Sequence, residues 1–454
     1  MVDDDLSWVP SKLPLQPPLY QSLYQNIQND IENGILPPYK QLPSQRELSY
    51  FLDIHFTTVT HAYELAIKQG LLYSEKGRGT FVSPNGVRDN TIQAQNNASH
   101  ISDLGILNMG HTPNSLAEST IKLAMSHVTL ATLSRYSTNA FDDQQYRQIC
   151  QQWFDYLQVP MNKNQSTLIT GGGQSGLAVI LSGLFKPYDT IVVDEYTYSN
   201  FIELAKTLHI KLLAIAQNQD SMDLVALEHL LTNQKINGVY VMPFLSNPTN
   251  RSMPLIRRQQ LARLSRQHDF IIIEDDYLRH LDTQKLPAII DLAPQNTIYI
   301  TSFSKIVAPG LRVAFLLYDQ QFDRQLRHSF TNLNLQEPTL DFEIIRYLIE
   351  HHLIEPLIHY QREQIERHVA VFREIFDFSA PNSPFQWVKI NPKLEIGKVK
   401  DDLAQQKIHV LLSPQFQAGG WRSHRDYFVR IAIAGISDTA QLQQILLRLK
   451  PIIR

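Results

Sequence analysis

Hydrophobic residues near the start of the chain recur every four positions, which is the spacing of one apolar helix face. The repeat consists of Leu19, Leu23, Ile27 and Ile31. Gly34 follows this repeat as a helix stop signal. A second helix, carrying Leu48, Phe51 and Leu52, is predicted to begin after Ser44, because Glu47 three residues later completes a capping box. This part of the chain therefore predicts two helices in succession.

A third helix and two short strands are predicted next. The apolar face of the helix consists of Val59, Ala62, Tyr63 and Ala66. The strands, at 71–74 and 80–82, flank a turn that contains two glycines. Two helices, a short turn, a third helix and a hairpin are the order of a winged helix-turn-helix. We therefore expect such a domain at residues 18–83, preceded by a flexible, proline-rich lead-in at 1–17.

The pattern changes after residues 84–103, which are rich in Asn, Gln and Ser and have the composition of a linker. Beyond this linker, short β-rich runs alternate with helical patterns, which is typical of βαβ units and a mostly parallel sheet. We expect a large α/β domain at 104–378 and a small α+β subdomain at 379–454.

Composition limits the class of protein. The 454 residues, 43% of them hydrophobic, are enough for two or three domains. The single cysteine, Cys150, can form neither an internal disulfide nor a zinc cluster, and we interpret it as a small buried hydrophobe. No apolar run reaches the length of a membrane span and the acidic N-terminus is unlike a signal peptide, so we expect a cytoplasmic protein. The 41 basic and 44 acidic residues do not by themselves indicate a nucleic-acid partner.

Functional side chains follow nearly every predicted strand of the large domain, where ligands bind in open α/β sheets. A glycine-rich run at 171–176 opens a helix whose N–H groups suit a phosphate. Lys305 follows another buried strand, although lysine is rarely buried unpaired. One ligand, pyridoxal 5′-phosphate (PLP), explains the set, because it needs a lysine for its aldehyde, a carboxylate for its ring nitrogen and donors for its phosphate.

Three motifs of the winged domain, LPSQREL, TVTHAYELAIKQGLL and KGRGTFV, lie at the spacing found in the GntR family of bacterial regulators, which this domain resembles. The resemblance implies that the third helix enters the major groove of double-stranded operator DNA and that the wing reaches the minor groove or its phosphates. The DNA contacts that it implies are Arg46, Thr57, Thr58, Thr60 and Arg78. Taken singly, each residue also has an ordinary interpretation as a solvated charge, a helix cap or a turn residue.

Two features depart from the GntR pattern. Asp53, His55 and Phe56 stand where the family commonly has Gly, Ser and Arg, which removes a phosphate or guanine contact. Residues 1–85 also carry six basic against nine acidic residues. We therefore expect a shallow salt dependence, a modest affinity per half-site and a dimer that doubles the contacts.

The series GGGQSG, NPTN, EDDY, SFSK and GLR strongly resembles the class I aminotransferases of fold type I over roughly residues 105–454. The resemblance implies the PLP-dependent transferase fold, with Lys305 forming the Schiff base to PLP and Asp275 holding the pyridinium proton. Tyr277 and Asn247 would bind the ring oxygen, and Tyr198 would stack on the ring. The phosphate would be surrounded by Gly173, Gln174, Ser302, Ser304 and Arg312.

Arg430 matches the arginine that binds a substrate carboxylate as a bidentate fork. Tyr136 matches a tyrosine that reaches the cofactor of the neighbouring subunit. Departures occur at Asn250, which replaces a glycine and can adopt the left-handed conformation, at residues 313–314, and in the loop after Tyr136, which lacks a glycine. These departures bear on the substrate side of the pocket.

A GntR-type domain, a polar linker and an aminotransferase-like domain in this order resemble the MocR subfamily of regulators. The resemblance implies a PLP-binding transcription factor whose signal is an amine, an amino acid or PLP itself, and a homodimer that is swapped head to tail. Two alternatives remain open from the residues. The chain could be an active aminotransferase with an auxiliary N-terminal domain, or a regulator that has lost the cofactor.

Overall fold

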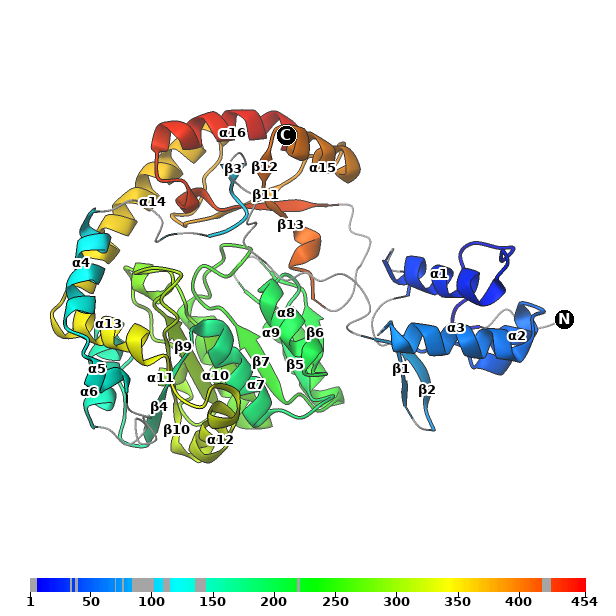
Figure 1. The fold of residues 1–454 in the computed structure, drawn as a ribbon, viewed down its shortest axis with the longest axis horizontal. Coiled ribbons are helices and arrows are strands. Elements are labelled where there is room, and N and C mark those ends of the chain that lie inside the picture. The colour runs from blue at the N-terminus through cyan, green and yellow to red at the C-terminus, as the bar shows by residue number, and fades with distance from the viewer. Residues whose placement is uncertain are drawn as a thin grey trace.

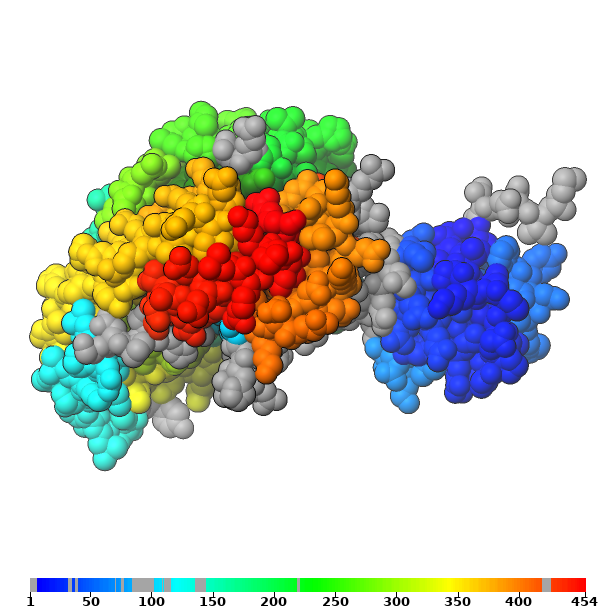
Figure 2. All heavy atoms as spheres, turned by 90° about the horizontal axis from the view of Figure 1, so that it is seen from above, coloured from blue at the N-terminus to red at the C-terminus, as the bar shows by residue number. Residues whose placement is uncertain are grey.

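The computed structural model describes residues 6–32, 35–36, 40–69, 71–75, 77–83, 102–107, 109, 115–134, 144–218, 221–418 and 426–454. A small N-terminal unit stands beside a larger unit built around a seven-stranded sheet (Figures 1 and 2). The ring of Tyr73 in the small unit stacks on that of Tyr188 in the larger one, at a centroid distance of 6.5 Å.

The N-terminal unit has the predicted order of three helices and a hairpin. Its elements are α1 (Leu19–Glu32), α2 (Gln45–Phe51), α3 (Phe56–Lys68), β1 (Leu72–Glu75) and β2 (Gly79–Val82). The capping box is present, because the Ser44 hydroxyl accepts from the Glu47 N–H at 3.2 Å and the Glu47 carboxylate accepts from the Ser44 N–H at 2.8 Å. The predicted inward positions of α1 and α3, except Leu19, supply half of the buried residues of its core. This unit is therefore a winged helix-turn-helix.

Part of the predicted flexible lead-in is packed onto α1. Trp8 is buried, and its indole N–H donates to the Asp30 carboxylate at 3.0 Å. The backbone N–H of Ser11 donates to the same carboxylate at 3.1 Å. The composition of residues 1–17 suggested a solvated segment, but one large apolar side chain with a buried acceptor is enough to anchor residues 8–12 to the winged unit.

The large sheet has the strand order β4-β10-β9-β8-β7-β5-β6. Its strands are β4 (Gln165–Thr170), β5 (Thr190–Asp194), β6 (Lys211–Ile215), β7 (Gly238–Val241), β8 (Ile271–Asp275), β9 (Thr297–Ser302) and β10 (Ala314–Asp319). The pairs β6–β5, β5–β7, β7–β8 and β8–β9 are parallel, and β10 is antiparallel to both of its neighbours. The predicted mostly parallel sheet is confirmed, with one reversed strand.

Helices cover both faces of this sheet (Figure 1). One face packs against α7 (Gly173–Leu184), α8 (Ser199–Thr207) and α12 (Asp323–Asn334). The other packs against α6 (Gln144–Tyr156), α9 (Leu224–Asn233), α10 (Leu255–His268), α11 (Ile289–Leu292) and α13 (Thr339–Glu350). Alternate residues of β8 belong to opposite faces, Ile272 to one and Ile273 to the other. Two further helices, α4 (Ser115–Ser126) and α5 (Leu130–Leu133), lie against α13.

The C-terminal part forms a second, smaller layer. Its elements are α14 (Ile354–Phe376), β11 (Gln386–Lys389), α15 (Ile396–Gln405), β12 (Ile408–His409), β13 (Leu411–Leu412), β14 (Phe428–Ile431) and α16 (Thr439–Ile453). The short strand β3 (Ser102–Asp103) pairs in parallel with β12, so these two residues of the predicted linker belong to the small subdomain. A two-residue strand carries no periodicity from which it could have been predicted.

Two local predictions, for Asn250 and Cys150, can be compared with this fold. Asn250 adopts a φ of 61°, in the left-handed region that was expected for it. Cys150 is buried and free, and burial raises the pKa of its thiol to about 12. In the part of the chain that the structure describes, no helix is long and apolar enough to cross a membrane and no group of side chains could hold a metal ion.

Candidate functional site

A cavity of about 240 Å³ lies at the carboxyl ends of the central strands of the large sheet. Of the residues that the sequence predicts to bind a cofactor or effector, those lining it are Gly173, Gln174, Tyr198, Asn247, Asp275, Tyr277, Ser302, Ser304, Lys305, Arg312 and Arg430. Tyr136, the remaining one, lies outside the described residues. Segments far apart in sequence therefore contribute to one cavity.

Lys305 follows β9 by three residues and reaches across the cavity. Its ammonium donates to the backbone carbonyl of Leu107 at 2.6 Å. Burial, followed by the charges of Arg430 and Arg312, lowers the pKa of Lys305 to about 8. A lysine with such a pKa has a substantial fraction of neutral, nucleophilic amine near neutral pH.

Asp275 is the last residue of β8, and its carboxyl group is buried. Its Oδ2 accepts from the Tyr240 hydroxyl at 2.8 Å, and the Tyr240 ring stacks on Phe201 at a centroid distance of 3.8 Å. Burial raises the pKa of Asp275 to about 7, an effect that outweighs the lowering by the Tyr240 hydrogen bond. A cationic ring nitrogen bound beside Asp275 would favour its ionised form.

The sequence did not single out Tyr240. It lies within the buried strand β7, where the sequence pattern does not distinguish its ring from the apolar side chains beside it. The available signal was its hydroxyl, because a buried tyrosine usually needs a hydrogen-bond partner. Its role in this cavity is to hold Asp275 in place.

The N-terminus of α7 and Arg312 form an anion-binding corner. Gly172 caps this helix at φ +84°, a backbone conformation that L side chains rarely adopt, and a Cβ there would lie 2.5 Å from the end of the Arg312 side chain. Arg312 donates to the Ser304 hydroxyl at 2.9 Å. Backbone N–H groups at a helix N-terminus beside a guanidinium suit a phosphate.

Arg430 enters the cavity from β14 of the small subdomain. It donates to the Asn247 side-chain oxygen at 2.8 Å and to the Gly105 carbonyl, and both partners are uncharged. Burial lowers its pKa to about 10, so it remains a cation at neutral pH. Its guanidinium also lies 5.0 Å from the centre of the Phe416 ring. Gly105 and Phe416 were not predicted, because neither residue type signals a site.

Several polar atoms in this cavity are buried without a hydrogen-bond partner. They are Gln174 Oε1, Tyr277 Oη and Arg430 Nε. Buried polar groups are nearly always paired, and each unpaired one carries a desolvation cost. A polar ligand of the cavity would therefore satisfy groups that the protein leaves open.

The predicted DNA-contacting residues lie on one unit but differ in their surroundings. Arg46 in α2 and Arg78 in the wing are exposed. The Thr57 hydroxyl lies 2.7 Å from the His55 ring, and Thr60 donates to the Gln45 side chain at 2.9 Å. Thr58 is half-buried near the start of α3.

Aromatic side chains also gather around the turn between α2 and α3. Tyr50, Phe51 and Phe56 are 74%, 43% and 42% exposed. The helical pattern placed Phe51 with Leu48, yet only Leu48 of α2 is buried. The helix ends at Phe51, so its ring is not covered by a following turn.

Two family models match the chain. Residues 103–449 match the family described as "Aminotransferase class I and II", and residues 19–82 match "Bacterial regulatory proteins, gntR family". The chain belongs to the class I and II aminotransferase family. Its fused GntR domain gives it the architecture of the MocR-type regulators and makes it a GntR-family helix-turn-helix transcriptional regulator with an aminotransferase-like domain.

Individual relatives of this MocR-type chain include both regulators and enzymes. The helix-turn-helix transcriptional regulator YdeF of Bacillus subtilis (strain 168) is 27% identical over 98% of this chain and 96% of its own length. The regulator NorG of Staphylococcus aureus (strain N315) is 23% identical, covering 63% of this chain and 70% of its own. A kynurenine aminotransferase of Pyrococcus horikoshii, solved in complex with PMP, superposes with a TM-score of 0.69 at 20% identity, over 80% of this chain and 95% of that one.

Proposed function

We propose that this chain is a PLP-binding regulator that binds operator DNA through its winged helix-turn-helix and senses an amine, an amino acid or PLP itself. The observation that carries the proposal is one cavity holding Lys305, Asp275 and the anion corner at Arg312. Full-length protein should retain PLP and should retard DNA from upstream of its own coding region at low salt. Failure to retard this DNA would contradict the regulator assignment.

The residues of the cavity fit PLP group by group. Lys305 would provide the amine for the aldehyde, Asp275 would accept from the protonated ring nitrogen, and the α7 N-terminus with Arg312 would hold the phosphate. Tyr277, whose hydroxyl is buried without a partner, and Asn247 would donate to the ring oxygen. When bound, PLP supplies an aldehyde that reacts with primary amines, so an amine effector competes with Lys305 for it.

Arg430 gives the proposed effector a second anchor. A carboxylate or sulfonate on the effector would pair with the buried guanidinium, whose Nε has no partner. Arg430 lies in the small subdomain and bonds to Asn247 of the large one. A ligand that replaces this bond would change the contact between the two layers, and closure of the small subdomain is a way to transmit that change.

An active aminotransferase is the second candidate function. The observation that favours it is the low pKa of Lys305, about 8, which suits a residue that exchanges protons during a reaction. Mixing the PLP-loaded protein with amino acids would distinguish the two functions. Rapid conversion to pyridoxamine phosphate with turnover would favour the enzyme, whereas binding with slow or no conversion would favour the sensor.

The rate of PLP incorporation should rise with pH. Condensation with the aldehyde needs the neutral amine of Lys305, whose fraction grows about tenfold per pH unit below its pKa of about 8 and levels off above it. Absorbance after mixing with PLP between about pH 6 and about pH 11 measures this rate. A profile that keeps rising steeply above about pH 9 would mean that Lys305 has an ordinary pKa.

A second copy of the chain is the proposed partner for an exposed apolar surface. Helices α4 and α5, which pack against α13, expose Leu123, Met125 and Leu130, the last of them to 79%. Exposed apolar patches of this kind mark interaction surfaces. We expect a homodimer through this surface, and the head-to-tail domain swap remains a prediction.

Replacing Leu123 with Glu and Leu130 with Arg together should convert the dimer into a monomer, because two charges would be desolvated at its centre. Sedimentation at micromolar concentration measures the change. Val225→Arg is the matched control, since Val225 is 67% exposed on the distant helix α9. A wild-type monomer, or a double variant that remains dimeric, would rule out this interface.

A further inference from the structure

Residues 102–107 form a short segment, here called the strap, between the small subdomain and the first cavity, which holds Lys305. The strap begins with β3, which pairs in parallel with β12 of the small subdomain. Its last two residues, Ile106 and Leu107, line the first cavity. Along the chain, residues 84–101 connect the strap to the winged unit. The strap is therefore the part of the large unit that follows this connection.

Two backbone carbonyls of the strap bind cations that the proposed function assigns to ligands. The Gly105 carbonyl accepts from the Arg430 guanidinium, and the Leu107 carbonyl accepts from the Lys305 ammonium at 2.6 Å. Lys305 belongs to the large domain, whereas Arg430 belongs to the small subdomain. The strap therefore bridges the two layers at the positions where a cofactor and an effector are proposed to bind.

A ligand would be a stronger partner for these cations than the strap is. A carboxylate pairs with a guanidinium through charge-assisted bonds, which are roughly twice as strong as bonds between neutral groups. An amine that has reacted with an aldehyde no longer has the three donors of an ammonium group. A ligand at Arg430 or at Lys305 would therefore compete with the strap.

One carboxylate ties the two ends of the strap together. Asp103 Oδ1 lies 2.7 Å from Nδ1 of His409, the residue beside it in β12. The same oxygen accepts from the backbone N–H groups of Gly105 and Ile106 at 2.8 and 3.2 Å. A shift of residues 105–107 would therefore break bonds of Asp103 and weaken the contact between β3 and β12.

The strap has a fixed point between these two ends. The Leu104 side chain is fully buried, and its carbonyl accepts from the Ala432 N–H at 2.7 Å. Two further backbone bonds, each of 2.9 Å, run from the Ser102 N–H to the Lys407 carbonyl and from the Leu104 N–H to the His409 carbonyl. Such a short pairing opens locally at a low cost in free energy. Leu104 can therefore serve as a pivot, with the Asp103 carboxylate coupling its two sides.

We propose that the strap is an autoinhibitory element, which a ligand of the first cavity displaces and which passes this displacement to the winged unit through Asp103. Ligand binding must first release the carbonyls of Gly105 and Leu107, so it shifts the strap toward a position with weaker pairing to β12. This inference rests on the proposed function, because it names the route by which the cavity regulates DNA binding. By linkage, a variant that loosens the strap should bind the ligand more tightly.

Two variants loosen the strap without changing a residue that lines the cavity. Asp103→Asn removes the carboxylate that holds His409. Gly105→Ala acts as a wedge, because its Cβ would lie 2.5 Å from the His409 ring, so the ring or the strap must shift. Both are needed, because the Asp103 carboxylate also acts electrostatically on Arg430. Gly105→Ala leaves that charge in place.

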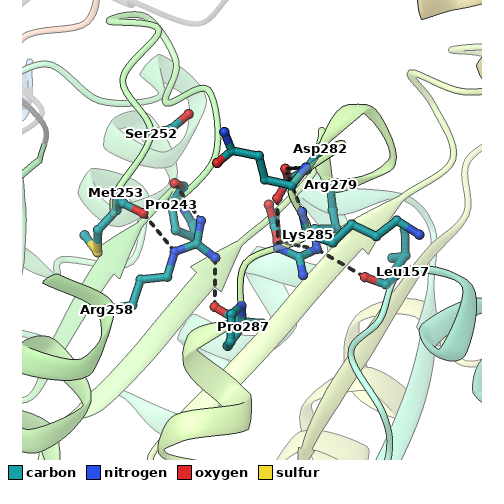
Figure 3. Close-up of polar contacts among 12 residues, drawn as sticks. Leu157, Pro243, Ser252, Met253, Arg258, Arg279, Asp282, Lys285 and Pro287 are labelled. Atoms are coloured by element: carbon teal, nitrogen blue, oxygen red, sulfur yellow. Dashed lines mark hydrogen bonds and ion pairs between the residues drawn. The ribbon is translucent and has the colours of Figure 1, made fainter. Parts of the chain in front are cut away.

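Asp282→Asn is the matched control. Like Asp103, Asp282 accepts from the backbone N–H groups two and three positions ahead, those of Gln284 and Lys285. It also pairs with a cation, Arg279, at 3.2 Å (Figure 3). Among the described residues it lines a second cavity, of about 280 Å³, and not the first. Any effect on folding of losing such a carboxylate would appear in this variant too.

Hydrogen exchange and binding of the full-length chain test the strap, with PLP as the probe. Saturating PLP should accelerate the exchange of residues 102–107 in the wild type. Asp103→Asn and Gly105→Ala should exchange these residues rapidly without PLP and should bind PLP about three- to tenfold more tightly. Both variants should also change the affinity for upstream DNA by about threefold or more, in the same direction. Asp282→Asn should match the wild type in all of these measurements.

The proposal is overturned if bound PLP leaves the exchange of the strap unchanged, or if both strap variants bind PLP and DNA as Asp282→Asn does. A change in Asp103→Asn alone would indicate an electrostatic effect on Arg430 and would overturn it as well. All of these results leave the proposed function intact, since the wild type still binds PLP and DNA. A wild type that fails to bind PLP or upstream DNA would contradict the proposed function, and this inference with it.

Discussion

Replacing Lys305 with alanine is expected to abolish the visible absorption band of PLP bound to the purified protein. Among the described residues that line the first cavity, Lys305 is the one lysine, and its lowered pKa keeps part of the amine neutral. The variant should fold, because the ammonium makes a single hydrogen bond to the described residues, at the Leu107 carbonyl. PLP that remains bound should be lost on dialysis, since only the phosphate and ring contacts hold it.

Lys285→Ala is the matched control for this experiment. Lys285 is a partly buried lysine of the same domain whose pKa is also lowered, mainly by burial, and whose ammonium donates to the Tyr156 carbonyl at 2.9 Å. It does not line the first cavity, so this variant should keep the band. If the Lys305 variant kept the band as well, or if wild-type protein never acquired one, the proposed cofactor site would be wrong.

Removing Arg46 and Arg78 together should weaken DNA binding by about a hundredfold, and each single alanine variant by about tenfold. Both side chains are exposed on the winged unit, one on α2 and one in the hairpin. The unit carries few cations, so the loss of two phosphate or groove contacts is a large share of its electrostatic attraction. Each variant should also reduce the salt slope of log affinity by about one.

Electrophoretic mobility shifts at several salt concentrations measure the affinity for DNA and the slope of its salt dependence. Arg324→Ala is the control, because Arg324 is exposed on α12 of the other unit. Equal losses in all three single variants would indicate nonspecific charge effects. Unchanged binding after the double substitution would place the DNA contacts elsewhere, for instance on the exposed aromatic residues around the α2–α3 turn.

Much of the fold follows from local patterns in the sequence. The repeat in α1 and the Ser44–Glu47 box depend only on neighbours within one helix turn, and both are present as predicted. The sequence also predicted that the residues following the strands of the large domain lie together, and the reason is the topology of the sheet. Parallel strands end at the same edge of a sheet, so their following residues meet there.

The remaining features depend on contacts between distant segments. The sequence around Tyr240 is that of an ordinary strand, and its hydrogen bond to Asp275, 35 positions away, is visible only in the fold. Trp8 lies in a proline-rich lead-in, and its buried acceptor, Asp30, is likewise known only from the structure. The strand β3 is defined only by pairing with β12, 306 positions later. No periodicity within one segment records such pairings.

Ligand binding in the aminotransferase-like domain is expected to change DNA binding by the winged domain. The most direct test measures the affinity of PLP-loaded, full-length protein for its own upstream DNA, with and without a panel of amines and amino acids. We predict that at least one member of the panel changes this affinity by about fivefold or more in the wild type and not in Lys305→Ala. The expectation is wrong if no amine or amino acid changes the DNA affinity of the wild type, so that the wild type and Lys305→Ala behave alike.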